Sequence, residues 1–513
     1  MSTDLTPKTS PLSKTRRWAA LAVLSASLVV ISIDMTILNV ALPHITADLE
    51  ATSAQQLWIV DIYSLVLAGL LVPMSAIADR FGRKRILLGG FAVFALASLL
   101  VLFAQDAGTL IAIRSLLGIG GAMIMPTTLS MIRVIFADPR ERATALGIWA
   151  AVSSVGMAIG PVVGGLLLEY STWHAAFLIN VPLMVIAVIT GLFLLPEYRV
   201  AVPPSWDTAG TIAIVGGMVA LVWSIKHIAK EGLTDPVSWV SFLVGAAALA
   251  WFVRRCLRRP NPMLELRLFR SSTFTAGILA ALSFMFAMSA LLLLSAQWLQ
   301  VVLGVSPLQA GLAMLPAVFA VGIASPLAPR LAALVGARAV LGGGLAIAGL
   351  GFLAIYLAPQ PLTYTSMAIA LVLLGVGGSS LAVGSALIMS GAPQDKAGNA
   401  AALEETSYEL GAVLGVAILG SVASAVYNSG LSPRDISALG LTDAQADAAR
   451  ESISGAASVA SSTGSAELMP LANDAFTTAL SQTGLVGFIV MTAVAIAVTV
   501  LVPRHHTLTS QAH

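Results

Sequence analysis

The chain has few charged residues for its length. Charged types make up 10% of its 513 residues, whereas soluble domains carry roughly 25%. Hydrophobic types make up 58%, and a soluble fold cannot enclose that much apolar surface beneath a polar skin. A net charge of +2 with no strongly basic, polar region also excludes a nucleic-acid-binding or disordered chain. A polytopic membrane protein remains.

Enzyme motifs and metal-ligand patterns are also missing. The single cysteine, Cys256, excludes an internal disulfide, a CxxC site and an iron–sulfur cluster. The six histidines show no metal-ligand spacing, and the adjacent pair His505 and His506 lies in the C-terminal tail. No P-loop, GxSxG or HExxH motif occurs. We therefore expect a protein that is not an enzyme and that needs no metal and no cofactor.

Apolar runs long enough to cross a bilayer recur along the whole chain. A helix needs about 20 mainly apolar residues to span the hydrocarbon. Breaks rich in charge, Pro or Gly divide the sequence into fourteen such runs, which predicts an all-α polytopic membrane protein. The predicted spans are residues 18–42, 54–78, 84–104, 107–133, 140–168, 173–195, 207–226, 236–254, 273–301, 307–330, 336–357, 362–390, 398–427 and 476–502.

The placement of basic residues supports this count. With the N-terminus in the cytoplasm, nearly all of the 27 Lys and Arg fall on the cytoplasmic side, as the positive-inside rule expects. Lys226, Lys230, Arg434 and Arg450 fall outside, and Arg114 falls within a span. Both termini are therefore predicted to be cytoplasmic.

The two halves of the chain resemble each other. Leu116–Gly121 recurs as Leu373–Gly378, and the pair Gly89–Gly90 recurs as Gly343–Gly344 at nearly the same offset. Parallel repeats of this kind place the substrate site between the halves. We predict residues 1–200 as a six-helix bundle, residues 201–268 as two inserted spans with a cytoplasmic linker, and residues 269–513 as a second, pseudo-symmetric six-helix bundle. The last part contains an extracellular loop, residues 428–475, for which a helical cover with Thr442 or Asp443 as cap and an unstructured tether both stay open.

Several ionisable residues lie inside predicted spans. Each charge near the bilayer centre costs roughly 2.5–3.5 kcal/mol on insertion scales, so these groups should face one another or an aqueous cavity. In a structural interpretation, Arg114 pairs with Asp34 or Asp61 to hold three helices together, and Glu404 reaches the inner headgroups. In a functional interpretation, carboxyl groups bind protons and cations alternately, because burial favours their protonated form. The candidate proton- and cation-binding residues are Asp34, Asp61, Glu404, Glu405 and Glu409.

Aromatic residues near these acids are candidates for binding a cation on a ring face. Packing in the core or at the membrane interface is the alternative for each of them. The candidates are Trp58, Tyr63, Trp149, Trp298 and Tyr408.

Two further segments carry unusual patterns. The loop between the second and third spans holds Asp79, Arg80, Gly82 and Arg83, an acid among bases where topology requires only bases. We interpret it either as a gating latch between two helix ends or as simple anchoring. The fifth span contains small residues four apart and a kinking proline, which fit either close helix packing or a bent pivot. These residues are Gly156, Gly160, Pro161, Gly164 and Gly165.

Four of these segments together resemble one known family. They are Asp34–Pro43, Asp79–Lys84, Arg114 with Gly118 and Gly120, and Gly160-Pro-Val-Val-Gly-Gly165. In this order they are similar to the fourteen-span drug:proton antiporter branch of the major facilitator superfamily. Gln56–Leu65 and Trp173–Pro182 resemble the QacA-type quaternary ammonium exporters in particular.

The resemblance implies proton-driven export of lipophilic cations, such as quaternary ammonium compounds and ethidium. It implies Asp34, Asp61, Glu405 and Glu409 as proton or cation sites, Arg114 as a proton-relay partner, and the loop of Asp79 and Arg83 as a conformational latch. The chain departs from the family pattern at Ser75, where the loop motif usually opens with glycine, and in residues 307–330, which contain no acid. The second departure favours monovalent over divalent cations.

We therefore predict a multi-pass secondary antiporter in a bacterial plasma membrane. Its expected partners are protons, small lipophilic cations and the lipid bilayer, with no nucleic acid, and we expect a monomer. The alternatives are an exporter of a native metabolite or lipid, a receptor or assembly scaffold that does not transport, and an importer.

Overall fold

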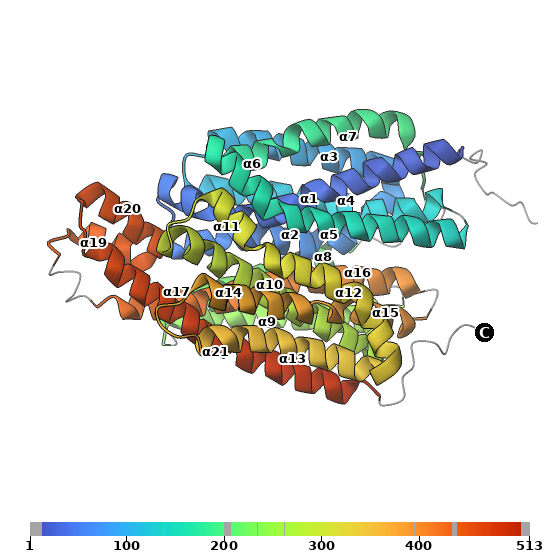
Figure 1. Cartoon of the computed structure of the whole chain (residues 1–513). Coiled ribbons are helices and arrows are strands. Elements are labelled where there is room, and N and C mark those ends of the chain that lie inside the picture. Colours follow the sequence, from blue (N-terminus) through green and yellow to red (C-terminus); the bar gives the residue numbers. More distant parts are fainter. Residues whose placement is uncertain are drawn as a thin grey trace, which may run out of the picture.

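The computed structural model describes residues 13–136, 138–199, 207–232, 234–260, 262–393, 396–432 and 439–503. All regular elements in these ranges are helices, and they lie side by side along one direction (Figure 1). A helix is found at each of the fourteen predicted places. Thirteen of them are long and apolar enough to cross a membrane, and α5 occupies the place of the remaining span.

The first six spans form one set of helices. They are α1 (Lys14–Asp48), α2 (Ser53–Phe81), α3 (Arg83–Leu100) with the short η1 (Val101–Phe103), α4 (Ala107–Ile135), α5 (Pro139–Tyr170), and α6 (Ala175–Leu178) with α7 (Asn180–Leu194). The inserted pair is α8 (Thr208–Glu231) and α9 (Pro236–Arg258), followed by η2 (Leu266–Arg270).

The last six spans form the second set. They are α10 (Ser272–Gln297) with η3 (Trp298–Val302), α11 (Pro307–Ala313) with α12 (Leu315–Val335), α13 (Ala337–Tyr356), α14 (Tyr364–Gly377) with α15 (Ser380–Ser390), α16 (Ala397–Gly415) with η5 (Val416–Gly420) and α17 (Ser421–Gly430), and α21 (Leu468–Leu501). Before α21, α19 (Asp443–Glu451) and α20 (Ile453–Thr463) lie beyond the ends of the long helices (Figure 1). The helical interpretation of this loop is correct, and Thr442 caps α19 through a capping box with Gln445.

Helix packing repeats between the two sets. In the first set, α1 packs on α5, α2 on α4 and α3 on α7; in the second, α10 packs on α16, α12 on α14 and α13 on α21. The repeated glycines lie at a further repeated contact, that of α3 with α4 in the first set and of α13 with α14 in the second. A Cβ on Gly90 would lie 3.2 Å from the carbonyl oxygen of Gly120, and one on Gly344 would lie 3.1 Å from that of Gly377. The two recurring motifs thus contact each other within each set, so the fold has two pseudo-symmetric six-helix bundles.

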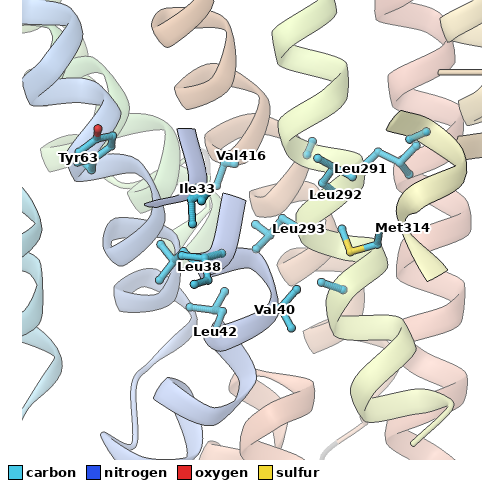
Figure 2. Close-up of a cluster of buried hydrophobic side chains, with 14 of the residues drawn as sticks. Ile33, Leu38, Val40, Leu42, Tyr63, Leu291, Leu292, Leu293, Met314 and Val416 are labelled. Carbon is cyan, nitrogen blue, oxygen red and sulfur yellow. The ribbon is translucent and has the colours of Figure 1, made fainter. Parts of the chain in front are cut away.

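The two bundles meet through apolar side chains of α1 and α10. Figure 2 shows Leu38 and Val40 on α1 near Leu293 on α10, and all three are buried. Gln300 adds a polar contact by donating from Nε2 to the carbonyl oxygen of Val40 at 3.0 Å. Large apolar side chains that remain exposed, such as Leu243 and Val244 on α9, suit a lipid environment.

The glycines of α5 allow close approach to two neighbours. A Cβ on Gly156 would lie 2.9 Å from Cβ of Ser32, and one on Gly164 would lie 2.5 Å from Cγ1 of Ile37, both on α1. Gly165 faces the other bundle, because its Cβ would lie 2.5 Å from Cα of Leu308 on α11. The glycines therefore serve close packing, and the contact of Gly165 holds the bundles together near the α19–α20 end.

The glycine at position 160 gives a test of this packing. A Cβ there would lie 3.1 Å from Cβ of Thr36 and 3.2 Å from the carbonyl oxygen of Ile33. We expect Gly160→Ala to lower the stability of the purified protein by about 1–3 kcal/mol, the usual cost of overpacking, as measured by thermal unfolding in detergent. Gly147→Ala is the matched control on the same helix, since nothing lies within 4 Å of its Cβ. Equal stability of both variants would contradict the packing.

Candidate functional site

Three helices converge on Asp34. Its Oδ2 lies 2.7 Å from Nη1 of Arg114 on α4, and its Oδ1 accepts a hydrogen bond of 2.9 Å from Nδ2 of Asn180 on α7. Arg114 also donates from Nε to the carbonyl oxygen of Ile59, and its guanidinium carbon lies 4.6 Å from the centroid of the Tyr63 ring. Asp34 is 0% and Arg114 1% exposed. The structure therefore has the predicted pairing of Arg114 with an acid, and that acid is Asp34.

A second buried ion pair holds Asp61. Its Oδ2 lies 2.8 Å from Nζ of Lys226 on the inserted helix α8. The same ammonium group lies 4.3 Å from the centroid of the Trp58 ring. The placement of Lys226 outside the membrane was wrong: the residue is 4% exposed, because α8 continues to Glu231, beyond the end of the predicted span.

The acids of α16 have three different environments. Glu404 is buried and accepts a hydrogen bond of 2.7 Å from the Tyr408 hydroxyl group. Glu409 is buried one turn beyond Glu405 and lies beside Ser64 of α2, and its Oε2 has no hydrogen-bond partner among the described residues. Glu405 is partly exposed and lines a cavity.

This cavity has a volume of about 320 Å³, within the usual range for small-molecule sites. It lies between the two bundles at the end that carries the loop of Asp79 and Arg83, away from α19 and α20. Its lining includes Glu405, Asp79, Arg83, Arg133 and Trp149. The remaining lining residues are Leu71, Val72, Ser75, Ala76, Met125, Pro126, Leu129, Ser130, Pro262, Met263, Asn399, Ala401 and Ala402.

The candidate aromatic residues separate into different roles. Trp149 lines the cavity and donates from Nε1 to Oγ1 of Thr128 at 3.3 Å. Trp58 and Tyr63 already lie against Lys226 and Arg114. Trp298 is 1% exposed within the apolar core. Trp149 is therefore the candidate placed to offer a ring face to a cation in the cavity.

The predicted latch is an internal contact of the first bundle. Arg83 donates to Asp79 at 2.8 Å and to the carbonyl oxygen of Ser130 at 3.1 Å. Gly82 adopts a φ of +113°, which favours glycine, at the turn from α2 to α3. Tyr198 covers the turn: its carbonyl oxygen accepts from the Arg83 backbone at 3.0 Å, and its ring lies 5.0 Å from the Arg83 guanidinium carbon.

Arg80 is exposed beside Phe81. It therefore takes no part in the contact between Asp79 and Arg83.

A third charged cluster fixes the inserted pair at the same end of the molecule. Asp207 caps α8 and lies 2.7 Å from Nε of Arg255 and 2.9 Å from Nη1 of Arg259. The hydrogen bond from Arg255 holds the pKa of Asp207 below its ordinary value. The carboxylate therefore stays ionised and keeps α8 and α9 together.

Sequence reasoning missed one partner of each buried aspartate, namely Asn180 beside Asp34 and Lys226 beside Asp61. Asn180 lies within the segment Trp173–Pro182, but an amide among apolar residues gives no sign of the acid that it contacts. Lys226 lay at the edge of its predicted span. A lysine at the end of a predicted span indicates that a longer span should also be considered. One further turn of helix places Lys226 within the membrane.

Comparison with known proteins agrees with this architecture. The family model described as "Major Facilitator Superfamily" matches residues 24–416. The chain belongs to the major facilitator superfamily. It is thus a multi-pass membrane transporter.

Two relatives of this superfamily member are named for multidrug efflux or for resistance to methyl viologen. A multidrug efflux pump, LfrA, of Mycolicibacterium smegmatis is 41% identical over 97% of this chain and 99% of its own length. The methyl viologen resistance protein SmvA of Salmonella typhimurium is 38% identical over 81% of this chain and 84% of its own. A bacterial homologue of the human lysosomal transporter Spinster has a TM-score of 0.67 at 18% identity, covering 96% of this chain and 98% of that one, which shows the shared fold.

The buried pair of Asp34 and Arg114 gives a testable stability effect. Removing one partner of a buried ion pair costs about 3–5 kcal/mol, because the other charge is left uncompensated. We expect Asp34→Asn to lower the thermal stability of the purified protein by that order. The double variant Asp34→Asn/Arg114→Met, which leaves no lone charge, should recover much of the loss. A double variant that is no more stable than Asp34→Asn would contradict the pairing.

Proposed function

We propose that this protein exports lipophilic, mainly monovalent organic cations in exchange for protons. The observation that carries the proposal is Glu405, a carboxyl group on the wall of a cavity that Trp149 and apolar side chains of α2 and α4 also line. A carboxylate and an aromatic face together recognise an organic cation. The name of the relative LfrA supports drugs as the substrate class. The name of SmvA supports quaternary cations in general, since methyl viologen carries two positive charges, and the preference for monovalent cations rests on this chain's own residues.

The orientation follows from charge. The basic residues around the cavity, among them Arg83 and Arg133, fit a cytoplasmic position under the positive-inside rule. The cavity then opens to the cytoplasm of a bacterial cell, both termini are cytoplasmic, and α19 and α20 cover the extracellular end. One chain contains both bundles and the cavity, so we propose that a monomer is the working unit.

The transport cycle needs one site for two ligands. A cation enters from the cytoplasm and pairs with the Glu405 carboxylate. The bundles then rock, which separates Gly165 from Leu308 and opens the extracellular side. A proton from outside neutralises Glu405, and the cation loses its counter-charge and leaves. Glu409, one turn away and in contact with α2, is the next acid that a proton reaches.

The other candidate residues act on the motion. The pair of Asp79 and Arg83 ties the end of α2 to α4 through Ser130, so it holds the first bundle rigid as it rocks. The buried pair of Asp34 and Arg114 acts in the same way between α1 and α4, and a relay of protons through Arg114 is the second role that we assign to it.

Ethidium movement in proteoliposomes tests the proposed function. The purified protein is reconstituted, a pH gradient is imposed, and a protonophore is added as control. We expect ethidium to accumulate against its gradient and the accumulation to collapse with the protonophore. No movement under the gradient would contradict the proposal and favour an exporter of a native metabolite or a non-transporting scaffold.

The role of Glu405 is tested by substitution. A charge-assisted contact contributes about 1.5–3 kcal/mol, which corresponds to about ten- to a hundredfold in affinity. We expect Glu405→Gln to weaken ethidium binding by that factor and to abolish gradient-driven transport. Glu467→Gln is the matched control, since Glu467 is an exposed acid just before α21. Wild-type binding by Glu405→Gln would contradict the assignment.

A further inference from the structure

The inserted helix α8 places a lysine in the interior of the transporter. Lys226 is 4% exposed, and its Nζ lies 2.8 Å from Oδ2 of Asp61 and 4.3 Å from the centroid of the Trp58 ring. Both partners are on α2, one turn apart. Among the described residues, neither Nζ of Lys226 nor Oδ2 of Asp61 has a well-formed hydrogen bond in addition. The ammonium group is therefore held by charge and by the aromatic face.

A carboxylate beside a Trp ring is the arrangement that binds an organic monocation. We propose that Asp61 and Trp58 form a second cation site, that Lys226 fills it as a tethered cation, and that this disfavours substrates with two positive charges. The proposal rests on the proposed function, because it names which cations the export site accepts.

The second site continues the row of acids that begins in the cavity. Glu405 lines the cavity, and Glu409 lies one turn further along α16. Ser64 on α2 lies beside Glu409, and Asp61 lies one turn from Ser64 on the same helix. A dication with one charge at Glu405 needs a second counter-charge along this row. Glu409 and Asp61 are the further acids of the row, and Lys226 already neutralises Asp61. A dication therefore has one acid fewer with which to pair.

The surroundings of Lys226 contain no competing described acid. α8 packs against α2, α9, α17 and η5. On α8 itself, His227 stacks on Trp223 and faces Asp235 at 3.4 Å. Among described residues, Asp61 is the carboxylate within ion-pair distance of Lys226. Removing the lysine charge therefore frees Asp61 and leaves the other charges in place.

Ethidium and propidium form a matched pair of probes, because they share one ring system and carry one and two positive charges. Binding of both dyes to purified protein and their transport in proteoliposomes are measured for the wild type and for Lys226→Met. We expect the wild type to prefer ethidium. In Lys226→Met, the ratio of propidium to ethidium affinity should rise at least about tenfold, the effect of one new charge-assisted contact.

Three variants separate specificity from structure. Lys226→Gln keeps a hydrogen-bonding group near Asp61 and should show the same gain, which keeps the test available if Lys226→Met does not fold. Lys226→Arg keeps the charge and should behave as the wild type. Lys226→Met/Asp61→Asn has no free acid and should lose the gain in propidium.

The outcomes distinguish a failure of the tethered-cation proposal from a failure of the proposed function. If the wild type moves ethidium and both neutral variants keep the wild-type ratio, the tethered-cation proposal is overturned and the proposed function stands. If the wild type moves neither dye under a pH gradient, the proposed function fails. A gain of propidium that persists in Lys226→Met/Asp61→Asn would also overturn the proposal, because Asp61 would not be the acid responsible.

Discussion

The structure depends on one constraint: a charge inside the hydrocarbon must be paired or must face water. The described charges within the helices obey it in different ways. Asp34 is neutralised by Arg114, and Asp61 by Lys226. Glu405 has no basic partner in the structure and lies on the cavity wall. Glu404 and Glu409 also lack a basic partner among the described residues, but both are buried. Glu405 is therefore the acid of α16 that a soluble ligand in the cavity can reach.

Helix α2 connects these sites. Its Ile59 and Tyr63 contact Arg114, its Asp61 holds Lys226, and its Ser64 contacts Glu409. At its end, Asp79 pairs with Arg83 beside the cavity. The cavity, two buried ion pairs and an acid of the second bundle thus all lie against one helix. A shift of α2 between the bundles changes the environment of several ionisable groups at once, which is what coupling of a proton to a cation requires.

The helices were predictable because long apolar runs can be recognised along the sequence alone. The same holds for the side of the membrane on which the basic residues fall. The acids in the membrane were predictable for the same reason, since any charge in an apolar run is conspicuous. Partners were not, because they depend on the rotation of each helix and on its neighbours. From the sequence, either Asp34 or Asp61 could pair with Arg114. No other base was expected near Asp61, because Lys226 was predicted to lie outside the membrane.

The aromatic residues also show that the sequence does not reveal the spatial neighbours of a side chain. Trp298, proposed as a cavity residue, packs in the apolar core, and Trp58 faces a lysine. A tryptophan in a span has the same local pattern whether it lines a cavity or fills a core. Close packing was one of the two interpretations that the sequence allowed for the glycines of α5. The neighbour that each glycine contacts became clear only from the positions of α1 and α11. The boundaries between the first bundle, the inserted spans and the second bundle, at residues 200 and 268, stay a prediction.

The central claim is that Glu405 exchanges a proton for an organic cation. Isothermal titration of ethidium into the purified protein, in two buffers of different ionisation enthalpy, counts the protons released on binding. At a pH where the acid is protonated before binding, the account predicts release by the wild type and none by Glu405→Gln. Binding of ethidium to the wild type without proton release at any pH, or equal release from both proteins, would contradict it.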